Sequence, residues 1–157
     1  MEFKELVAGL ATELGNPSLA EGVEDAWGFV VDGMTIVARV REDQTAFTLD
    51  GDMGSPPPEG RAAFERTLLT ANADLMARTG FAFALGDGDH YRLVAACELQ
   101  TMDLAAFAGK IESFVNELER WRAVLGEYVP RAATLERASE ADALESRNFS
   151  LGGFLQV

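Results

Sequence analysis

The chain has 157 residues, of which 48% are hydrophobic and 25% charged, and this composition predicts a single globular domain. Its 13 basic and 26 acidic residues leave a net charge of −13, which argues against nucleic acid or an anionic membrane as the partner, because both attract clustered positive charge. The single cysteine, Cys97, excludes an internal disulfide and a multi-cysteine zinc site.

The first 60 residues predict one helix and three strands. Apolar residues recur every three or four positions from Phe3 to Leu14, which predicts an amphipathic helix that ends at Gly15-Asn16-Pro17. The pair Asp32-Gly33 lies between AWGFVV and MTIVARV and predicts a tight hairpin. Thr45–Leu49 predicts a third strand, and the stretch 50–60, DGDMGSPPPEG, is expected to be irregular because three prolines remove backbone donors.

The rest of the chain predicts helix, two strands and helix. Arg61–Arg78 forms the first of these helices, with Gly80 as its C-cap, and two alternating stretches around Phe83 and Leu93 form the strands. Asp103 is placed to cap a helix that runs to Leu125. The predicted fold is therefore α+β, a five-stranded antiparallel sheet with three helices in the order α-β-β-β-α-β-β-α. The domain is expected over residues 1–128, followed by a C-terminal extension, 129–157, that is partly helical or disordered.

Acidic residues and the only histidine gather in FALGDGDHYRLVA, residues 83–95. A calcium loop of the EF-hand type needs oxygen ligands spread over about 12 positions and a closing glutamate, and the alternation that follows His90 predicts a strand instead. We therefore interpret this stretch, and the similar Asp50-Gly51-Asp52, as turns rather than metal sites. His90 has no recognisable nucleophile partner in the sequence, and Cys97 lies in an apolar strand. No catalytic residue, metal or cofactor is predicted.

Four stretches resemble class I type III secretion chaperones of the Tir-chaperone (CesT-like) family. They are LVAGLATELG, FVVDGMTIVARV, TLLTANADLMARTGFAFAL and FAGKIESFVNELERWRAVL. The order of the elements, the small size and the acidity are also similar. The resemblance covers Met1 to Tyr128, while the DGDMGSPPPEG loop and the extension depart from it.

The resemblance implies a non-catalytic homodimer that binds the N-terminal, non-globular segment of a secreted effector and keeps it competent for export. Its effector grooves would lie near the first helix and the outer strands, and its dimer contact on the middle helix and the strand after it. For effector binding this implies Leu6, Leu10, Trp27, Phe29 and Ile36. For the dimer interface it implies Phe64, Leu68, Leu69, Leu75, Phe81 and Phe83.

Two other functions stay open at the level of the sequence. One is a regulatory adaptor on the same fold, which binds an anti-activator or belongs to the similar YbjN-like group. The other is a small-ligand-binding domain or enzyme. A cytoplasmic location is expected, because charged residues interrupt the apolar residues of Met1–Leu14 and no long apolar stretch follows. The apolar end of the extension, Phe149–Val157, could mask a groove, or the extension could be disordered or locally packed.

Overall fold

The computed structural model describes residues 2–20, 22–23 and 25–130. The helices and strands, with two short 3-10 turns, follow the predicted order: α1 Phe3–Glu13, η1 Pro17–Ala20, β1 Ala26–Val31, β2 Met34–Val40, β3 Ala46–Gly54, α2 Arg61–Thr79, β4 Phe81–Leu85, η2 Asp87–Asp89, β5 Tyr91–Glu98 and α3 Leu104–Gly126.

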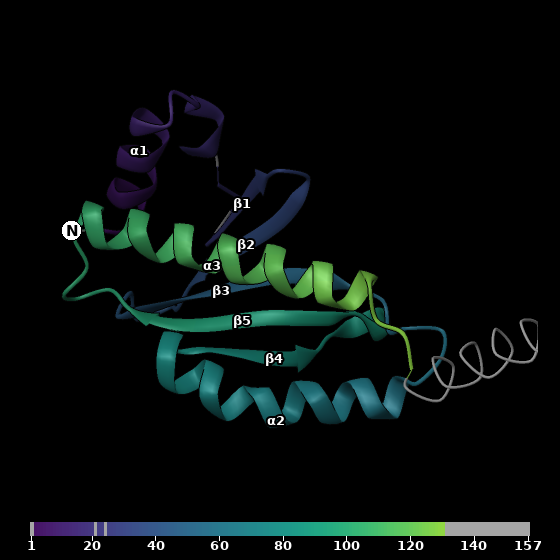
Figure 1. Ribbon diagram of the computed structural model, residues 1–157. Coiled ribbons are helices and arrows are strands. Elements are labelled where there is room, and N and C mark those ends of the chain that lie inside the picture. The colour runs from purple at the N-terminus through teal and green to yellow at the C-terminus, as the bar shows by residue number, and fades with distance from the viewer. Residues whose placement is uncertain (1, 21, 24, 131–157) are drawn as a thin grey trace, which may run out of the picture.

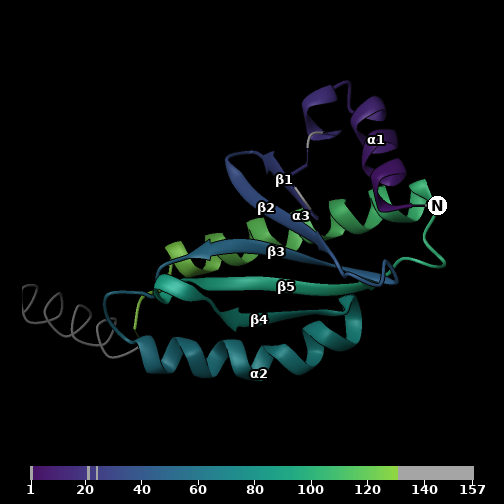
Figure 2. The ribbon, with the colours of Figure 1, turned by 180° about the vertical axis from the view of Figure 1, so that it is seen from behind.

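The five strands form one sheet in the order β1-β2-β3-β5-β4, and all neighbours are antiparallel. This confirms the predicted fold. Helices α1 and α3 lie on the same face of the sheet, and α2 runs along the edge formed by β4 (Figure 1). Seen from behind, the opposite face of β3, β5 and β4 has no helix of the described chain over it (Figure 2). One face of the sheet therefore belongs to the core, and the other carries no helix of the described chain.

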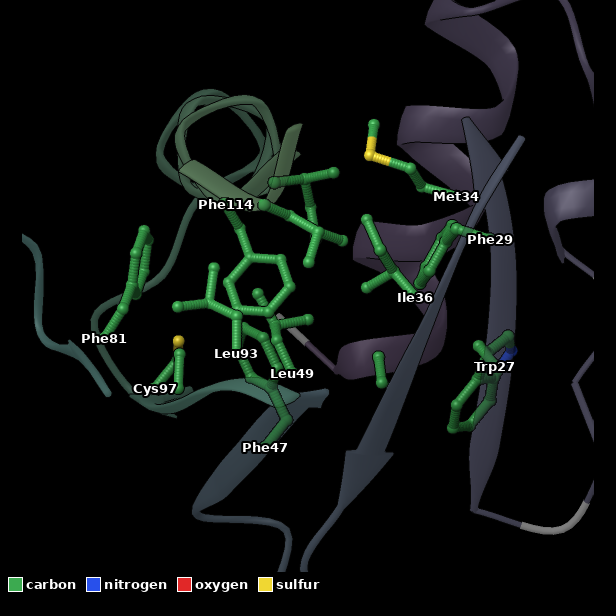
Figure 3. Packing of buried hydrophobic residues seen from close by; sticks show 14 of the residues in the cluster. Trp27, Phe29, Met34, Ile36, Phe47, Leu49, Phe81, Leu93, Cys97 and Phe114 are labelled. Atoms are coloured by element: carbon green, nitrogen blue, oxygen red, sulfur yellow. The ribbon is translucent and has the colours of Figure 1, made fainter. Parts of the chain in front are cut away.

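Aromatic rings fill the layer between the sheet and its two covering helices. The ring of Phe3 on α1 lies 4.9 Å from Trp27, 5.0 Å from Phe47 and 5.6 Å from Phe107 between ring centroids. Helix α3 buries one apolar stripe against the sheet, and this stripe consists of Phe107, Ile111, Phe114, Leu118 and Trp121. Figure 3 shows part of this cluster from close by, with Cys97 inside it. The buried thiol agrees with the interpretation of Cys97 as a core residue.

The predicted ends of the helices are confirmed by their caps. Asp103 accepts a hydrogen bond from the Ala106 N–H at 2.8 Å at the start of α3. Gly80 ends α2 with a φ of 73°, and its N–H donates to the carbonyl of Met76. The hairpin prediction is also confirmed, since Asp32 and Gly33 both have positive φ, as a type I′ turn requires.

The predicted boundary of the third strand was wrong. We expected the strand to end at Leu49, but β3 continues to Gly54 and pairs with β5 over this stretch, with an irregularity between Asp52 and Gly54. The side chains alternate, because Gly51 and Met53 face the core while Asp50 and Asp52 face the open side. Asp50 is held there by Arg92, whose Nε lies 2.5 Å from its Oδ1. Acidic residues were therefore compatible with a strand, and the irregular loop begins only at Ser55.

Candidate partner-binding surfaces

The residues predicted to contact an effector lie in the core of the single chain. Leu6, Phe29 and Ile36 are at most 1% exposed, and Leu10 and Trp27 are each 4% exposed. Phe29 and Ile36 belong to the cluster around Phe47 (Figure 3). Their alternation on β1 and β2 and their helical spacing on α1 describe packing between these elements. An effector contact by these five residues stays a prediction.

Of the five residues predicted to contact an effector, Trp27 lines a hollow in the surface of the described chain. It shares with Phe3 a hollow of about 420 Å³ between the start of α1 and the start of β1. The rest of its lining is Leu99 and the polar residues Glu2, Lys4, Asp25, Gln44 and Gln100. We call this hollow the α1–β1 hollow. An apolar floor with a polar rim is suited to one side chain of an extended peptide.

The outer edge of β1 carries backbone groups that no strand of the described chain pairs with. The Val40 N–H donates to the Asp25 carbonyl at 3.0 Å, and the alternation of an antiparallel pair therefore turns the N–H and C=O of Ala26, Gly28 and Val30 outward. Ala26 exchanges two hydrogen bonds with Val23. Gly28 and Val30 thus offer their groups at the edge, and the Val30 side chain is 69% exposed.

The opposite edge of the sheet is closed by α2. The Gly86 N–H donates to the His90 carbonyl at 2.8 Å, so Phe81, Phe83 and Leu85 of β4 turn their backbone groups outward. The Asn72 side chain of α2 accepts from the Phe83 N–H at 2.7 Å and faces its carbonyl at 3.5 Å. A strand cannot add along the middle of β4 while Asn72 holds this position.

The residues predicted for the dimer interface divide into two groups. Phe64, Leu68, Leu75 and Phe81 are at most 4% exposed and pack inside the chain. Leu69 is 72% exposed. Phe83 is half-buried, and its ring centroid lies 4.6 Å from that of Trp121. A dimer contact by this set stays a prediction, and Leu69 is its one freely accessible side chain.

Two concave surfaces lie beside β4, one on the open face of the sheet and one between α2 and the edge of β4. The first, which we call the sheet-face hollow, has a volume of about 600 Å³ and is lined mainly by small or apolar side chains, including Thr48, Met76, Ala82, Val94 and Ala96. The second, which we call the α2–β4 groove, has a volume of about 250 Å³ and is lined by Arg61, Glu65, Leu68, Leu69, Phe83, Ala84, Leu85 and Tyr91.

A polar network closes one end of the α2–β4 groove. The Arg61 guanidinium donates to Glu65 at 2.7 Å and to both oxygens of Asp89, and it holds the pKa of the Asp89 carboxyl below its ordinary value. The Tyr91 hydroxyl donates to Glu65 at 3.1 Å, and burial, together with this carboxylate, raises the pKa of Tyr91 to about 12. Asp89 is exposed, and through Arg61 it also anchors η2 to the start of α2.

A Ser–His–Asp cluster escaped the sequence analysis because its members are far apart in the chain. His90 Nδ1 lies 3.0 Å from both carboxylate oxygens of Asp52, and its Nε2 lies 3.2 Å from Ser55 Oγ. The extension of β3 to Gly54 brings these residues together. Pro56 follows the serine and has no N–H to stabilise an oxyanion. His90 and Asp52 are about 40% exposed. The cluster ties the proline loop to the sheet.

No group of three or more His, Cys, Asp or Glu side chains among residues 2–20, 22–23 and 25–130 is arranged to hold a metal ion. Within the same part of the chain, no helix has the length and apolarity needed to cross a membrane.

Solved structures of type III secretion chaperones share this fold. The chain is similar to a chain of the ExsC–ExsE complex, with 19% identity and a TM-score of 0.68 over 80% of this chain and 97% of that one. It is similar to a chain of the HopA1–SchA chaperone–effector complex, with 12% identity and a TM-score of 0.65 over 77% and 93%. A chain of the ExoU–SpcU complex from Pseudomonas aeruginosa matches with 15% identity and a TM-score of 0.60 over 78% and 97%. The fold is thus that of a type III secretion chaperone.

The sequence assigns the chain to a family within this class. A model of the Tir chaperone protein (CesT) family matches residues 5–122, which is more than half of the chain, and the chain belongs to this family. No curated protein sequence matches the chain. Membership in a family of chaperones agrees with the prediction of a non-catalytic protein.

Proposed function

We propose that this protein is a cytoplasmic secretion chaperone that works as a homodimer and binds the N-terminal, non-globular segment of a type III effector. The observation that carries the proposal is the pair of unequal sheet edges: Asn72 closes β4, while Gly28 and Val30 leave β1 open. A disordered segment can form backbone hydrogen bonds along such an open edge without folding into a globule.

The β1 edge and the α1–β1 hollow together give the binding site for this segment. An added strand would bond to Gly28 and Val30 and pack against the exposed Val30 side chain. One of its apolar residues would enter the α1–β1 hollow over Trp27 and Phe3. The backbone bonds supply affinity for any sequence, and the hollow supplies selectivity for the anchor.

Replacing Gly28 with proline tests this site. Proline removes the outward N–H and crowds the incoming strand, while Gly28→Ala keeps the N–H and places its methyl group in open space. Loss of one or two backbone hydrogen bonds should weaken binding of the co-purified effector's N-terminal segment by roughly 3- to 30-fold, measured by calorimetry. Equal affinities of the proline and alanine variants, with both folded by circular dichroism, would contradict the proposed edge.

The sheet-face hollow supports the homodimer. Its small side chains, Ala82 and Ala96 among them, let a second copy approach the sheet closely, and Met76 offers an adaptable apolar contact at the rim. The face around this hollow has no helix of the described chain over it (Figure 2). Apolar surface of this kind on a soluble chain is typical of an interface.

Sedimentation velocity at micromolar concentration tests the dimer. The wild-type chain should sediment with twice the chain mass. Ala96→Glu should sediment as a monomer, because it places a carboxylate in the hollow. Thr35→Glu, on the same sheet face but outside the hollow, is the matched control and should stay dimeric. A monomeric wild-type chain, or an Ala96→Glu dimer, would contradict this arrangement.

A further inference from the structure

The Ser–His–Asp cluster at the end of β3 has no role in the proposed function, although its three side chains are placed for proton transfer. His90 Nδ1 lies 3.0 Å from both carboxylate oxygens of Asp52, and His90 Nε2 lies 3.2 Å from Ser55 Oγ. Burial raises the pKa of the Asp52 carboxyl, but hydrogen bonds from His90 and the Gly54 N–H outweigh burial and leave this pKa below its ordinary value. Asp52 is therefore an ionised acceptor.

The ionised Asp52 determines how the neutral ring of His90 is protonated. A carboxylate can only accept hydrogen bonds, so Nδ1 carries the ring proton and Nε2 presents its lone pair to Ser55. The Ser55 hydroxyl then donates to Nε2 at 3.2 Å, which is within reach for proton transfer. A nucleophile, a base and a carboxylate that orients the base are thus in line, and this arrangement activates a serine whatever the order of the three residues in the chain.

The serine is also accessible and held in place. Ser55 is exposed, and the side chains of His90 and Asp52 are each about 40% exposed. The Gly54 N–H donates to Asp52 at 2.9 Å, which fixes the backbone just before the serine. The three prolines at 56–58 restrict φ just after it. An electrophile can therefore reach the Ser55 hydroxyl from solvent without any opening of the fold.

Two features of the surroundings limit what the serine can do. Pro56 has no N–H, so the residue after the nucleophile cannot stabilise an oxyanion, and we expect one transfer per chain rather than turnover. The surroundings are also acidic, because Asp52 and Asp89 flank His90, while the neighbouring cations Arg61 and Arg92 are paired with carboxylates. Anionic donors are repelled by this charge, and neutral or cationic donors are not.

We propose that Ser55 is a nucleophilic serine that takes up one acyl or phosphonyl group from a neutral or cationic activated donor. Ser55 Oγ forms a bond to the acyl carbon or the phosphorus, the bond from that atom to its leaving group breaks, and the hydroxyl proton passes to His90 Nε2 and then to the leaving group. The modified serine has no hydrogen left to donate, so the proline loop, residues 55–60, loses its tie to His90.

This modification site is separate from the proposed binding surfaces. It involves neither the β1 edge nor the sheet-face hollow, so binding of an effector and modification of Ser55 can each fail without the other. It also does not involve the C-terminal extension, since residues 131–157, with the predicted masking segment Phe149–Val157, lie outside the described residues.

Labelling of the 157-residue chain with a neutral alkyl fluorophosphonate tests the proposal. The serine oxygen displaces fluoride from phosphorus, and the adduct is located and timed by peptide mass spectrometry. We expect one phosphonyl group per chain, at Ser55, with a rate at least about 100-fold above that at Ser18. Ser18 is the matched control, because it is also exposed but bonds to Asn16 at 2.6 Å, and His90 is the only histidine of the chain.

Variants of the cluster separate activation of the serine from a purely structural contact. His90→Gln keeps a hydrogen-bonding side chain but removes the base, and labelling of Ser55 should fall to the rate of Ser18. Asp52→Asn should slow labelling about 10-fold or more, because the ring loses its orienting carboxylate. Added imidazole should restore part of the rate to His90→Ala, which a structural contact would not allow.

The ratio of the rates at Ser55 and Ser18 in the wild-type chain depends on no variant, and circular dichroism shows whether each variant is folded. Three results would overturn the proposal: no adduct at Ser55, labelling spread equally over the exposed serines, or an unchanged rate at Ser55 in folded His90→Gln.

Discussion

Gly51 is the residue that sets how closely α3 approaches the sheet. A Cβ atom there would lie 2.6 Å from a Leu118 methyl group and 3.1 Å from the Phe114 ring. Gly51→Ala therefore forces α3 outward, and we expect the free energy of unfolding in urea to fall by about 1–3 kcal/mol. Gly28→Ala is the control, because its Cβ meets nothing within 4 Å, and its change should stay within about 0.5 kcal/mol. Equal effects of the two substitutions would contradict this packing.

Asp52 makes stability depend on pH at the acid end. Burial raises the pKa of its carboxyl, but hydrogen bonds from His90 and the Gly54 N–H outweigh burial and leave the pKa below its ordinary value. A lowered pKa in the folded state stabilises the fold above the unfolded value of about 4, and this contribution is lost as pH falls through the folded value. The stability advantage of the wild type over Asp52→Asn should therefore be full above about pH 5 and shrink toward pH 3.

Urea unfolding of both proteins at several pH values measures this difference. Asp32→Asn, at the turn between β1 and β2, controls for the change in net charge. An advantage over Asp52→Asn that stayed constant from pH 6 to pH 3 would show that the Asp52–His90 contact has no electrostatic role in the fold.

At the scale of elements, α2 determines which edge of the sheet stays open. Replacing Asn72 with alanine leaves the Phe83 N–H and C=O without their side-chain partner. We expect a loss of about 1–3 kcal/mol in the free energy of unfolding, and concentration-dependent association through the exposed β4 edge, seen by light scattering. Thr70→Ala, on an exposed side of the same helix, should change neither quantity. A stable, non-associating Asn72→Ala protein would show that α2 closes the edge without this side chain.

The sequence predicted the elements well because their signals are local. Helical spacing, the Asp32-Gly33 turn, the Asp103 cap and the Gly80 C-cap each depend on a few neighbouring residues, and all four are present in the structure. The end of β3 was missed because Asp50 and Asp52 read as a turn, while their partners Arg92 and His90 lie about 40 residues away. Contacts between distant residues leave no periodic pattern.

The candidate surfaces were harder to predict, for a physical reason. Apolar spacing shows which side chains are removed from water, but residues of the core and residues of a partner-binding groove produce the same spacing. Phe29 and Leu68 are core residues of the chain, whereas their neighbours Val30 and Leu69, in the same apolar stretches, are exposed. The signal that separates them is the direction of each side chain relative to the sheet, which is fixed only when the strands have paired.

For the whole molecule, the family and the open surfaces describe a protein that binds another chain rather than transforming a small molecule. The ordering of a disordered partner on binding costs about 2–5 kcal/mol or more of free energy. A large buried surface must offset this cost. Two β1 edges and two α1–β1 hollows in a dimer would supply that surface along one extended chain. The net charge of −13 favours a partner segment that is neutral or basic.

Co-purification from the native host is the measurement that tests this account most directly. The tagged chain is isolated, its partners are identified by mass spectrometry, and the complex is then treated with protease to find the protected fragment. We predict one stoichiometric secreted protein, protected only over an N-terminal segment of roughly 100 residues, the scale of an interface coupled to ordering. A regulator as the partner would favour the adaptor function instead. A globular protein bound through its folded domain, or no partner, would contradict the chaperone account.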